Sequence, residues 1–499
     1  MPPKRPFAYE PSSLAMVHKA PVHGGPRPQY ERVPSQPENP FAALIPDQHI
    51  AIVPEFTLES GITLYNVPLA YTTRGKLSAD GDNAMVICHA LTGSADVGDW
   101  WGPLMGGPGR AFDTSRFFIV CMNSLGSPYG TASPVTAKDG DPAKGRYGPE
   151  FPLTTIRDDV NLHKLLLDDL GVRQVAAVIG GSLGGMFVLE WAYFGRDYVR
   201  CVVPIATSSR HSAWGISWGE AQRQSIYADP KYDDGYYPFD DPPTAGLGAA
   251  RMTALLTYRS RNSFEARFGR NIPDPSRVQT IREPTTRPST PSEAHFRIHN
   301  DGHKVKRTAA SSGEAGPAPG NGADPQFEGP SKDCGGPVTG GEAMPTSTYF
   351  SAQSYLRYQG TKFVKRFDGN CYIAMTRKLD THDVSRNRAP TIAEALGLIQ
   401  QPTLVLGIES DGLFTFAEQE EIAQHVGDAR LERIDSPEGH DAFLLQFEQV
   451  NRYILAFLKE VLPDMMSREG GELEEETGVG QMTKSSTFGE AEVDDITAW

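Results

Sequence analysis

Two parts of the chain alternate between short apolar runs and stretches of helical periodicity. The runs are apolar at almost every position, a pattern typical of strands that are buried on both faces of a parallel sheet. Between them, apolar residues recur at helical spacing. This alternation predicts an α/β fold with a mostly parallel central sheet. Strands are predicted at 84–89, 117–121, 175–179, 199–205, 402–408 and 430–434, with a hairpin at 56–64 and a further strand at 67–71, and helices are predicted at 155–170, 416–425 and 441–461.

The alternation is interrupted between residues 213 and 385. Helical patterning is present at 249–258 and again at 347–372, without strands between. Residues 272–345 are poor in large apolar side chains and rich in Gly, Pro, Ser and charge, which predicts a disordered insertion. We interpret 213–385 as a helical cap that contains this insertion.

The cap separates two halves of one α/β core, which we place at 43–212 and 386–465. Residues 1–42 are rich in proline and lack apolar periodicity, so they are predicted to be a disordered leader. Residues 466–499 are acidic and polar and are predicted to be a flexible tail.

Charge and cysteine content exclude several classes of function. The formal net charge of −15 disfavours binding to nucleic acid or to an anionic membrane. The five cysteines lack metal-ligand spacing and fit a reducing compartment, so no metal site is expected. No run of 18 apolar residues predicts a membrane span, and the N-terminus has no apolar signal core. We therefore expect a cytoplasmic protein.

One serine stands among glycines where an apolar run changes to helical spacing. The run at 175–179 leads into Gly180-x-Ser182-x-Gly184, and an apolar helical stretch follows. Strand, tight turn and helix in this order predict a nucleophile elbow, in which a strained backbone holds the serine hydroxyl over the end of the sheet. A second G-x-S-x-G around Ser217 has no strand before it, so we interpret Ser217 as a chance match.

An activated serine requires a base, and the base requires an acid that orients it. In folds with a nucleophile elbow the chain order is Ser, Asp or Glu, then His. Asp411 follows the strand at 402–408 and His440 follows the strand at 430–434, which places both at the sheet edge that carries Ser182. Asp411 is preferred as the acid, and Glu409 and Glu438 stay open as alternatives.

The developing oxyanion requires two backbone N–H groups. The residue after the nucleophile, Leu183, is predicted to supply one, and the loop after an earlier strand supplies the other. That loop is His89-Ala90-Leu91-Thr92-Gly93, and we assign the second donor to Leu91. His89 ends a buried strand and is interpreted as structural.

Long stretches of the chain resemble the fungal homoserine O-acetyltransferases over about 41–271 and 348–460. The resemblance is carried in order by CHALTGSADVGDWWGP, NSLGSPYG, RYGPEFPLTTIRDDV, GGSLGGM, AARMTALLTYRSRNSFEARFGR, SYLRYQGTKFVKRFDGNCYIAMTRKLDTHD and SDGLF…EGHDAFLL. It implies the α/β-hydrolase fold and the acetylation of L-homoserine, a step of methionine synthesis. Acetyl-CoA would be the acyl donor and a substrate, with no permanently bound cofactor.

The resemblance also assigns residues to roles. The family's catalytic triad falls on Ser182, Asp411 and His440. Its contacts for the carboxylate and hydroxyl of homoserine fall on Arg251 and Tyr258. Its contact for the amino group falls on Asp441, and family members are commonly homodimers through the cap helices.

Other functions fit the same residues. A related O-acyltransferase would act on L-serine or deacetylcephalosporin C, and an esterase-type serine hydrolase would use water as the acceptor. A catalytically inactive fold that only binds a ligand is the third possibility. The complete set of Ser182, Asp411 and His440 argues against the third, and the resemblance favours transfer to homoserine over the others.

Overall fold

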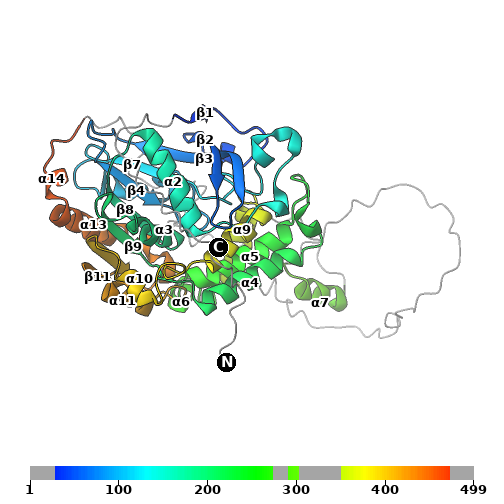
Figure 1. The fold of residues 1–499 in the computed structure, drawn as a ribbon. Helices are drawn as coiled ribbons and strands as arrows, with labels where there is room; N and C mark the ends of the chain where they lie inside the picture. Colours follow the sequence, from blue (N-terminus) through cyan, green and yellow to red (C-terminus); the bar gives the residue numbers. More distant parts are fainter. Residues whose placement is uncertain (1–28, 273–289, 303–349, 472–499) are drawn as a thin grey trace, which may run out of the picture. The chain divides into compact units, whose positions relative to one another are not determined.

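The computed structural model describes residues 29–272, 290–302 and 350–471 (Figure 1). The described residues divide into two compact units, a larger one and a smaller one, with boundaries between Gly269 and Arg270 and between Ser354 and Tyr355. The larger unit is built around a sheet in which nine strands are described. Their order across the sheet is β1 (Glu31–Val33), β2 (His49–Thr57), β3 (Thr63–Arg74), β7 (Phe118–Met122), β4 (Ala84–Cys88), β8 (Val175–Gly181), β9 (Val199–Ile205), β10 (Thr403–Gly407) and β11 (Ala429–Arg433).

The pairings from β7 to β11 are parallel, and those that join β1, β2, β3 and β7 are antiparallel. The predicted α/β fold with a mostly parallel sheet is therefore confirmed. A separate pair of short strands, β5 (Met105–Gly106) and β6 (Phe112–Asp113), lies outside the main sheet.

Helices cover both faces of the sheet, which explains why its central strands β4 and β7 are apolar and buried at every position. In β8, Val178 packs into one core with the helices α2 (Ile156–Leu170) and α3 (Leu183–Ala192), and Ile179 packs into the other core with α13 (Phe447–Val461). Val202 and Val203 in β9 divide in the same way, because successive side chains of a strand point to opposite faces. The helices are α1 (Val97–Trp101), α2 (Ile156–Leu170), α3 (Leu183–Ala192), α4 (Ala213–Tyr227), α5 (Thr244–Tyr258), α6 (Arg261–Arg267), α7 (Pro291–His299), α8 (Ser351–Phe363), α9 (Gly369–Asp380), α10 (Ile392–Leu396), α11 (Phe416–His425), α12 (Ala442–Leu445), α13 (Phe447–Val461) and α14 (Pro463–Met466).

The part of the predicted cap, 213–385, that belongs to the larger unit is helical. Its helices α5 and α9 each pack against α4, and all three lie between β9 and β10 in the chain (Figure 1). The predicted continuous helical stretch at 347–372 is instead two helices, α8 and α9. The break is set by Asp368, whose carboxylate accepts a hydrogen bond from the N–H of Cys371 (3.0 Å) and caps α9.

The predicted leader and tail are each wrong in part. Residues 31–33 form β1, which pairs with β2 and so extends the sheet at its edge. An edge strand is held by backbone hydrogen bonds and can carry polar side chains. The hairpin at 56–64 and the strand at 67–71 are one long hairpin of β2 and β3. At the other end, Arg468 forms an ion pair with Asp82 at 2.6 Å, so the tail does not begin at 466.

Two further predictions differ from the structure. The predicted insertion at 272–345 contains α7 at Pro291–His299, so the prediction of disorder is wrong there, and 273–289 and 303–345 lie outside the described residues. The predicted last helix at 441–461 is divided into a 3₁₀ turn (Gly439–Asp441), α12 and α13. By contrast, α11 and β9 have the predicted bounds.

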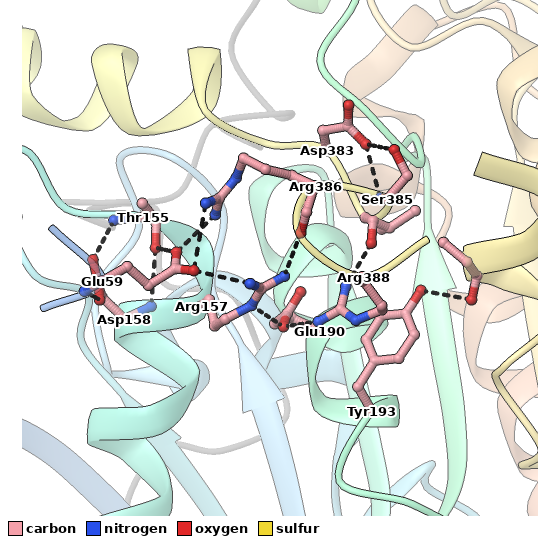
Figure 2. A network of polar contacts seen from close by, with 12 residues as sticks. Glu59, Thr155, Arg157, Asp158, Glu190, Tyr193, Asp383, Ser385, Arg386 and Arg388 are labelled. Carbon is pink, nitrogen blue, oxygen red and sulfur yellow. Dashed lines mark hydrogen bonds and ion pairs between the residues drawn. The ribbon is translucent and has the colours of Figure 1, made fainter. Parts of the chain in front are cut away.

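A network of charged side chains connects α3 to the segment that leaves the cap (Figure 2). Glu190 of α3 is buried and accepts hydrogen bonds from Arg157 Nε (2.8 Å) and from Arg388. Arg157 and Arg386 both form ion pairs with Glu59 of the β2–β3 turn, at 2.9 and 2.7 Å. The network therefore holds together α2, α3, the β2–β3 turn and residues 386–388.

The Glu190 carboxylate is the anion on which two of these arginines converge. Burial raises the pKa of Glu190, but the charges and hydrogen bonds of Arg157 and Arg388 outweigh burial and hold its pKa below the usual value. A carboxyl group with a lowered pKa stabilises the fold above its unfolded pKa, about 4.3, and loses that contribution as the pH falls through the folded value.

We therefore expect Glu190→Gln to lower the free energy of unfolding by about 3 kcal/mol at pH 7, because two partly buried guanidinium groups lose their shared buried anion. Urea titration at pH 7 and below pH 4 checks this, and the difference from wild type is expected to shrink in acid. Glu409→Gln is the control, since its ion pair with Arg433 is exposed and is worth about 0–1 kcal/mol. Equal effects of the two variants would contradict the interpretation.

Candidate active site

Ser182 lies on the turn between β8 and α3 and has a backbone conformation that is unusual for a residue with a side chain. Its φ is 59° and its ψ is −124°. The turn is held by hydrogen bonds from the Ser182 N–H to Ile205 O (3.0 Å) and from the Thr207 hydroxyl to Ser182 O (2.8 Å). The positive φ is the strained backbone that the sequence predicts for a nucleophile elbow.

The glycines on both sides of Ser182 are required by close packing. A Cβ at Gly184 would lie 2.1 Å from the carbonyl oxygen of Cys88 in β4, and one at Gly180 would lie 2.7 Å from the backbone of Gly184. A Cβ at Gly185 would lie 2.5 Å from Thr207. The strand and the helix can meet this closely only because these positions carry no side chain.

His440 is oriented by Asp411. Its Nδ1 lies 2.7 Å from Asp411 Oδ2, and both side chains are buried. The other carboxylate oxygen, Asp411 Oδ1, accepts hydrogen bonds from the N–H groups of Leu413 (2.8 Å) and Phe414 (3.0 Å). A carboxylate held on both oxygens gives the imidazole one orientation.

The two alternative acids have other partners. Glu409 forms an ion pair with Arg433 at the surface, at 2.8 Å. Glu438 accepts from Arg259 and Arg267, each at 2.8 Å. Of the three carboxylates that the sequence left open, Asp411 is the one that contacts His440.

Ser182 and His440 line the same cavity, which has a volume of about 80 Å³. Leu91, Tyr258 and Asp441 line it as well, so the structure brings together most of the residues singled out in the sequence. Leu183 follows Ser182 as the first residue of α3. The rings of Tyr258 and His440 are adjacent, with their centroids 6.2 Å apart.

Asp441 contacts a residue that the sequence did not single out. Its Oδ2 lies 2.8 Å from Arg259 Nε, and both side chains are buried. Arg259 follows the last residue of α5 and also contacts Glu438. The carboxylate at the cavity wall is therefore anchored to the end of a cap helix.

Arg251 is not among the described residues that line the cavity. It is buried on α5, with its guanidinium carbon 5.5 Å from the ring centroid of Tyr258 and 4.8 Å from that of Phe363. Arg251 thus lies against a cavity residue, Tyr258, and stacks on aromatic rings.

Ser217 is placed in the middle of α4, where its hydroxyl donates to the carbonyl oxygen of Ala213 (2.8 Å). A helical serine with this local hydrogen bond has no elbow geometry, which agrees with its interpretation as a chance match.

Several cavity residues from the cap and from the segment just before it could not be found from the sequence, because no local pattern marks them. His211, Trp218 and Gln222 come from α4 or the residues before it, and Thr376 comes from α9. His211 follows β9 at the sheet edge that carries Ser182, and this position was the one signal available for it.

Within 29–272, 290–302 and 350–471, no group of three or more His, Cys, Asp or Glu side chains is arranged to hold a metal ion. In the same ranges, every helix is too short or too polar to cross a membrane.

Comparison with known proteins gives matches over nearly the whole chain. A family model described as "alpha/beta hydrolase fold" matches residues 83–293. The homoserine O-acetyltransferase of Emericella nidulans is 69% identical over 491 residues, covering 95% of this chain and 99% of that protein. The homoserine O-acetyltransferase of Saccharomyces cerevisiae is 54% identical over 475 residues, covering 92% and 96%. These matches extend beyond the segments that carry the resemblance in the sequence.

Solved structures show the same fold at lower identity. The homoserine O-acetyltransferase from Bacillus anthracis gives a TM-score of 0.61 at 19% identity, covering 85% of this chain and 98% of that one. Esterase E22 gives a TM-score of 0.63 at 20% identity, covering 82% and 99%. Because a transferase and an esterase match equally well, these structures support the fold alone.

The geometry of the turn predicts the effect of adding one methyl group to it. Gly184→Ala is expected to destabilise the protein by about 3 kcal/mol, because the new Cβ would collide with the backbone of β4. Helix propensity alone would make the alanine variant more stable by about 1 kcal/mol. A loss of stability in Gly184→Ala would therefore be due to the collision. Gly427→Ala is the control, since a Cβ there meets nothing within 4 Å. Urea titration of both variants checks the prediction, and a Gly184→Ala protein with wild-type stability would show that the close approach is wrong.

Proposed function

Because the chain belongs to the homoserine O-acetyltransferase family, on the alpha/beta hydrolase fold, we propose that it transfers an acetyl group from acetyl-CoA to the hydroxyl of L-homoserine. The observation that carries the proposal is Ser182 on a strained turn in one cavity with His440, whose Nδ1 is held by Asp411. The reaction proceeds through an acetyl-serine in two half-reactions, a ping-pong mechanism.

In the first half-reaction the Ser182 hydroxyl attacks the thioester carbonyl while His440 takes its proton. Asp411 keeps the proton on Nδ1 and stabilises the imidazolium. The N–H groups of Leu91 and Leu183 receive the oxyanion of the tetrahedral intermediate. The C–S bond then breaks, His440 returns the proton to the departing thiolate, and free CoA leaves an acetyl ester on Ser182.

In the second half-reaction homoserine takes the place of CoA. Its hydroxyl gives a proton to His440 and attacks the acetyl ester, and the same two N–H groups receive the oxyanion. The intermediate collapses with release of the Ser182 oxygen, which regains its proton from His440. The products are O-acetylhomoserine and the free enzyme.

The acceptor is a zwitterion, so its site requires one cation and one anion. Arg251 and Tyr258 are proposed to hold the carboxylate and hydroxyl, and Asp441 to hold the ammonium. Tyr258 and Asp441 at the cavity wall support this assignment. The ammonium would share the Asp441 carboxylate with Arg259, which lies 2.8 Å from it.

The alternatives use the same machinery with another acceptor. Water would make the protein an esterase, and L-serine or deacetylcephalosporin C would make it a related O-acyltransferase. Relatives at 69% and 54% identity that are named homoserine O-acetyltransferases support homoserine. We further propose a role in methionine biosynthesis, a cytoplasmic location, and a homodimer of this chain that uses no resident cofactor.

The acetyl-enzyme is the direct test of this mechanism. Acetyl-CoA alone is expected to give a burst of about one free thiol per active site and a mass increase of one acetyl group on the peptide that contains Ser182. Ser182→Ala should lose both signals, and Ser217→Ala should keep both. Turnover with homoserine, L-serine, deacetylcephalosporin C or water then identifies the acceptor. Acetylation that persists in Ser182→Ala, or release to water as fast as to homoserine, would contradict the proposal.

Arg251 is expected to govern use of the acceptor and not acylation. Loss of a charge-assisted hydrogen bond to the substrate carboxylate costs on the order of 2–5 kcal/mol, which is roughly a 30- to several-thousand-fold loss in kcat/KM for homoserine. Arg251→Met is suited to the test because it retains much of the packing against Phe363. Arg251→Lys should recover activity in part, since lysine lacks the planar fork.

The acylation burst separates the possible outcomes for these variants. In Arg251→Met the burst with acetyl-CoA should persist, because that half-reaction does not involve the acceptor carboxylate. Loss of the burst together with homoserine turnover, or normal homoserine turnover, would show that the role of Arg251 is misassigned.

A further inference from the structure

The loop that carries Leu91 is held from behind by two side chains without an assigned role. The carbonyl oxygen of Ala90 accepts hydrogen bonds from His89 Nδ1 (2.8 Å) and from the N–H of Gly93 (3.0 Å). The carbonyl oxygen of Thr92 accepts from Arg366 Nη1 (3.0 Å). Two of the loop's carbonyl groups are therefore fixed in direction, one by the core and one by the cap.

Fixing the Ala90 carbonyl also fixes the Leu91 N–H. The two groups belong to the same peptide unit, which is planar and trans, so they point in opposite directions. Leu91 lies on the cavity wall together with Ser182. A side chain that holds the Ala90 carbonyl on the far side thus sets the direction in which the Leu91 N–H donates.

The contacts of His89 define one state of its ring. Nε2 lies 3.2 Å from the N–H of Ser124, which can only donate, so Nε2 must accept and Nδ1 must carry the proton that is donated to Ala90 O. Burial lowers the pKa of His89 to about 4, so the neutral ring is the form present at neutral pH. In the protonated ring, Nε2 would also carry a proton, and this N–H would point at the backbone N–H of Ser124.

The segment behind His89 is itself held by the cap. The N–H of Leu125, next to Ser124, donates a hydrogen bond to Asp159 Oδ1 (2.6 Å), and the carbonyl oxygen of Leu125 accepts one from Lys378 Nζ (2.6 Å). Asp159 of α2 and Lys378 of α9 form an ion pair in which both side chains are fully buried. Residues of the cap thus hold the loop both directly, through Arg366, and indirectly, through Lys378.

Arg366 is placed by contacts on each side. It follows α8, is buried, and also donates from Nη1 to the hydroxyl of Tyr129 (2.9 Å). Its guanidinium carbon lies 4.9 Å from the ring centroid of Phe363. A planar cation that is stacked on a ring and bonded to a hydroxyl reaches Thr92 in one direction only.

We propose that His89 and Arg366 are positioning residues that aim the Leu91 N–H at the oxyanion, and that the cap thereby sets the geometry of the oxyanion hole. The inference rests on the proposed function, in which Leu91 is an oxyanion donor, and adds the residues that orient this donor. Neither side chain touches the reacting atoms. Both act through the two carbonyl groups that they hold.

The two amide analogues of histidine separate positioning from packing. In His89→Asn the side-chain N–H₂ replaces Nδ1 and keeps the contact with Ala90 O. In His89→Gln the amide reaches the Nε2 position and keeps only the contact with Ser124. Both variants lose the ring, so a role in packing alone predicts equal effects.

We expect His89→Gln to slow both half-reactions by the same factor, on the order of 10- to 100-fold, which is less than the 10²–10³ for complete loss of a donor. Since both steps form an oxyanion at the same place, kcat should fall while KM for acetyl-CoA changes little. His89→Asn should retain at least about ten times the activity of His89→Gln. Arg366→Met should act in the same direction by about tenfold, and Arg366→Lys should recover part of the loss.

His382→Gln is the matched control, because His382 is also buried and contacts a backbone carbonyl, Ser208 O, at 2.9 Å. It is expected to lower the melting temperature as the His89 variants do and to change kcat by no more than about threefold. Stopped-flow thiol release for acylation, turnover with homoserine, and thermal melting complete the set of measurements.

Equal rates in His89→Asn and His89→Gln, or slowing of one half-reaction only, would overturn the positioning role. A wild-type protein that gives no acetyl-enzyme with acetyl-CoA would instead refute the proposed function. Wild-type acylation together with an unimpaired His89→Gln variant would refute the positioning inference alone.

Discussion

The close approach of α3 to the ends of β4 and β8 is the constraint on which the rest of the site depends. A methyl group at Gly184 would lie 2.1 Å from a backbone oxygen of β4, so the helix reaches this position only without a side chain there. The approach forces Ser182 into a positive φ and places its side chain at the edge of the sheet. The N-terminus of α3 then faces the same point, where the proposed reaction would develop negative charge.

Buried charges connect the cap to this edge of the core. Lys378 pairs with Asp159, Arg259 pairs with Asp441, and Arg366 donates to Thr92. Buried ion pairs contribute little net stability compared with apolar packing, but the loss of one partner is costly, so they tolerate few alternative arrangements. We infer that they serve to place cap helices against the loops of the core and so define the shape of the cavity.

The machinery for acyl transfer and for ester hydrolysis is the same in this fold, and the acceptor site distinguishes them. The core supplies Ser182, Asp411 and His440, whereas Tyr258, Trp218 and Thr376 reach the cavity from cap helices. In the proposed reaction, an acceptor with two charges would be selected by partners on the cap and at the cap–core boundary. A transferase on this scaffold therefore depends on how the cap is seated, and the core alone does not determine it.

Local backbone chemistry explains how much of the site is predictable from the sequence. The glycine spacing around Ser182 and the apolar strands before Asp411 and His440 are short-range signals, and the elbow and the sheet edge follow from them. The choice between Asp411, Glu409 and Glu438 is different, because all three lie within a few residues of strand ends. The structure shows that Asp411 contacts His440, whereas Glu438 binds Arg259 and Arg267, and Glu409 binds Arg433 at the surface.

The sequence by itself determined the fold class, the position of the elbow and most strands and helices of the core, because these depend on hydrophobic period and on glycine. Only the tertiary structure decided the rest. The edge strand β1 is polar and owes its form to pairing with β2. Arg366 meets Thr92 across 274 positions of the chain, and Lys378 meets Asp159 across 219. Contacts over such separations leave no periodic trace, because they depend on which surfaces the folded chain brings together.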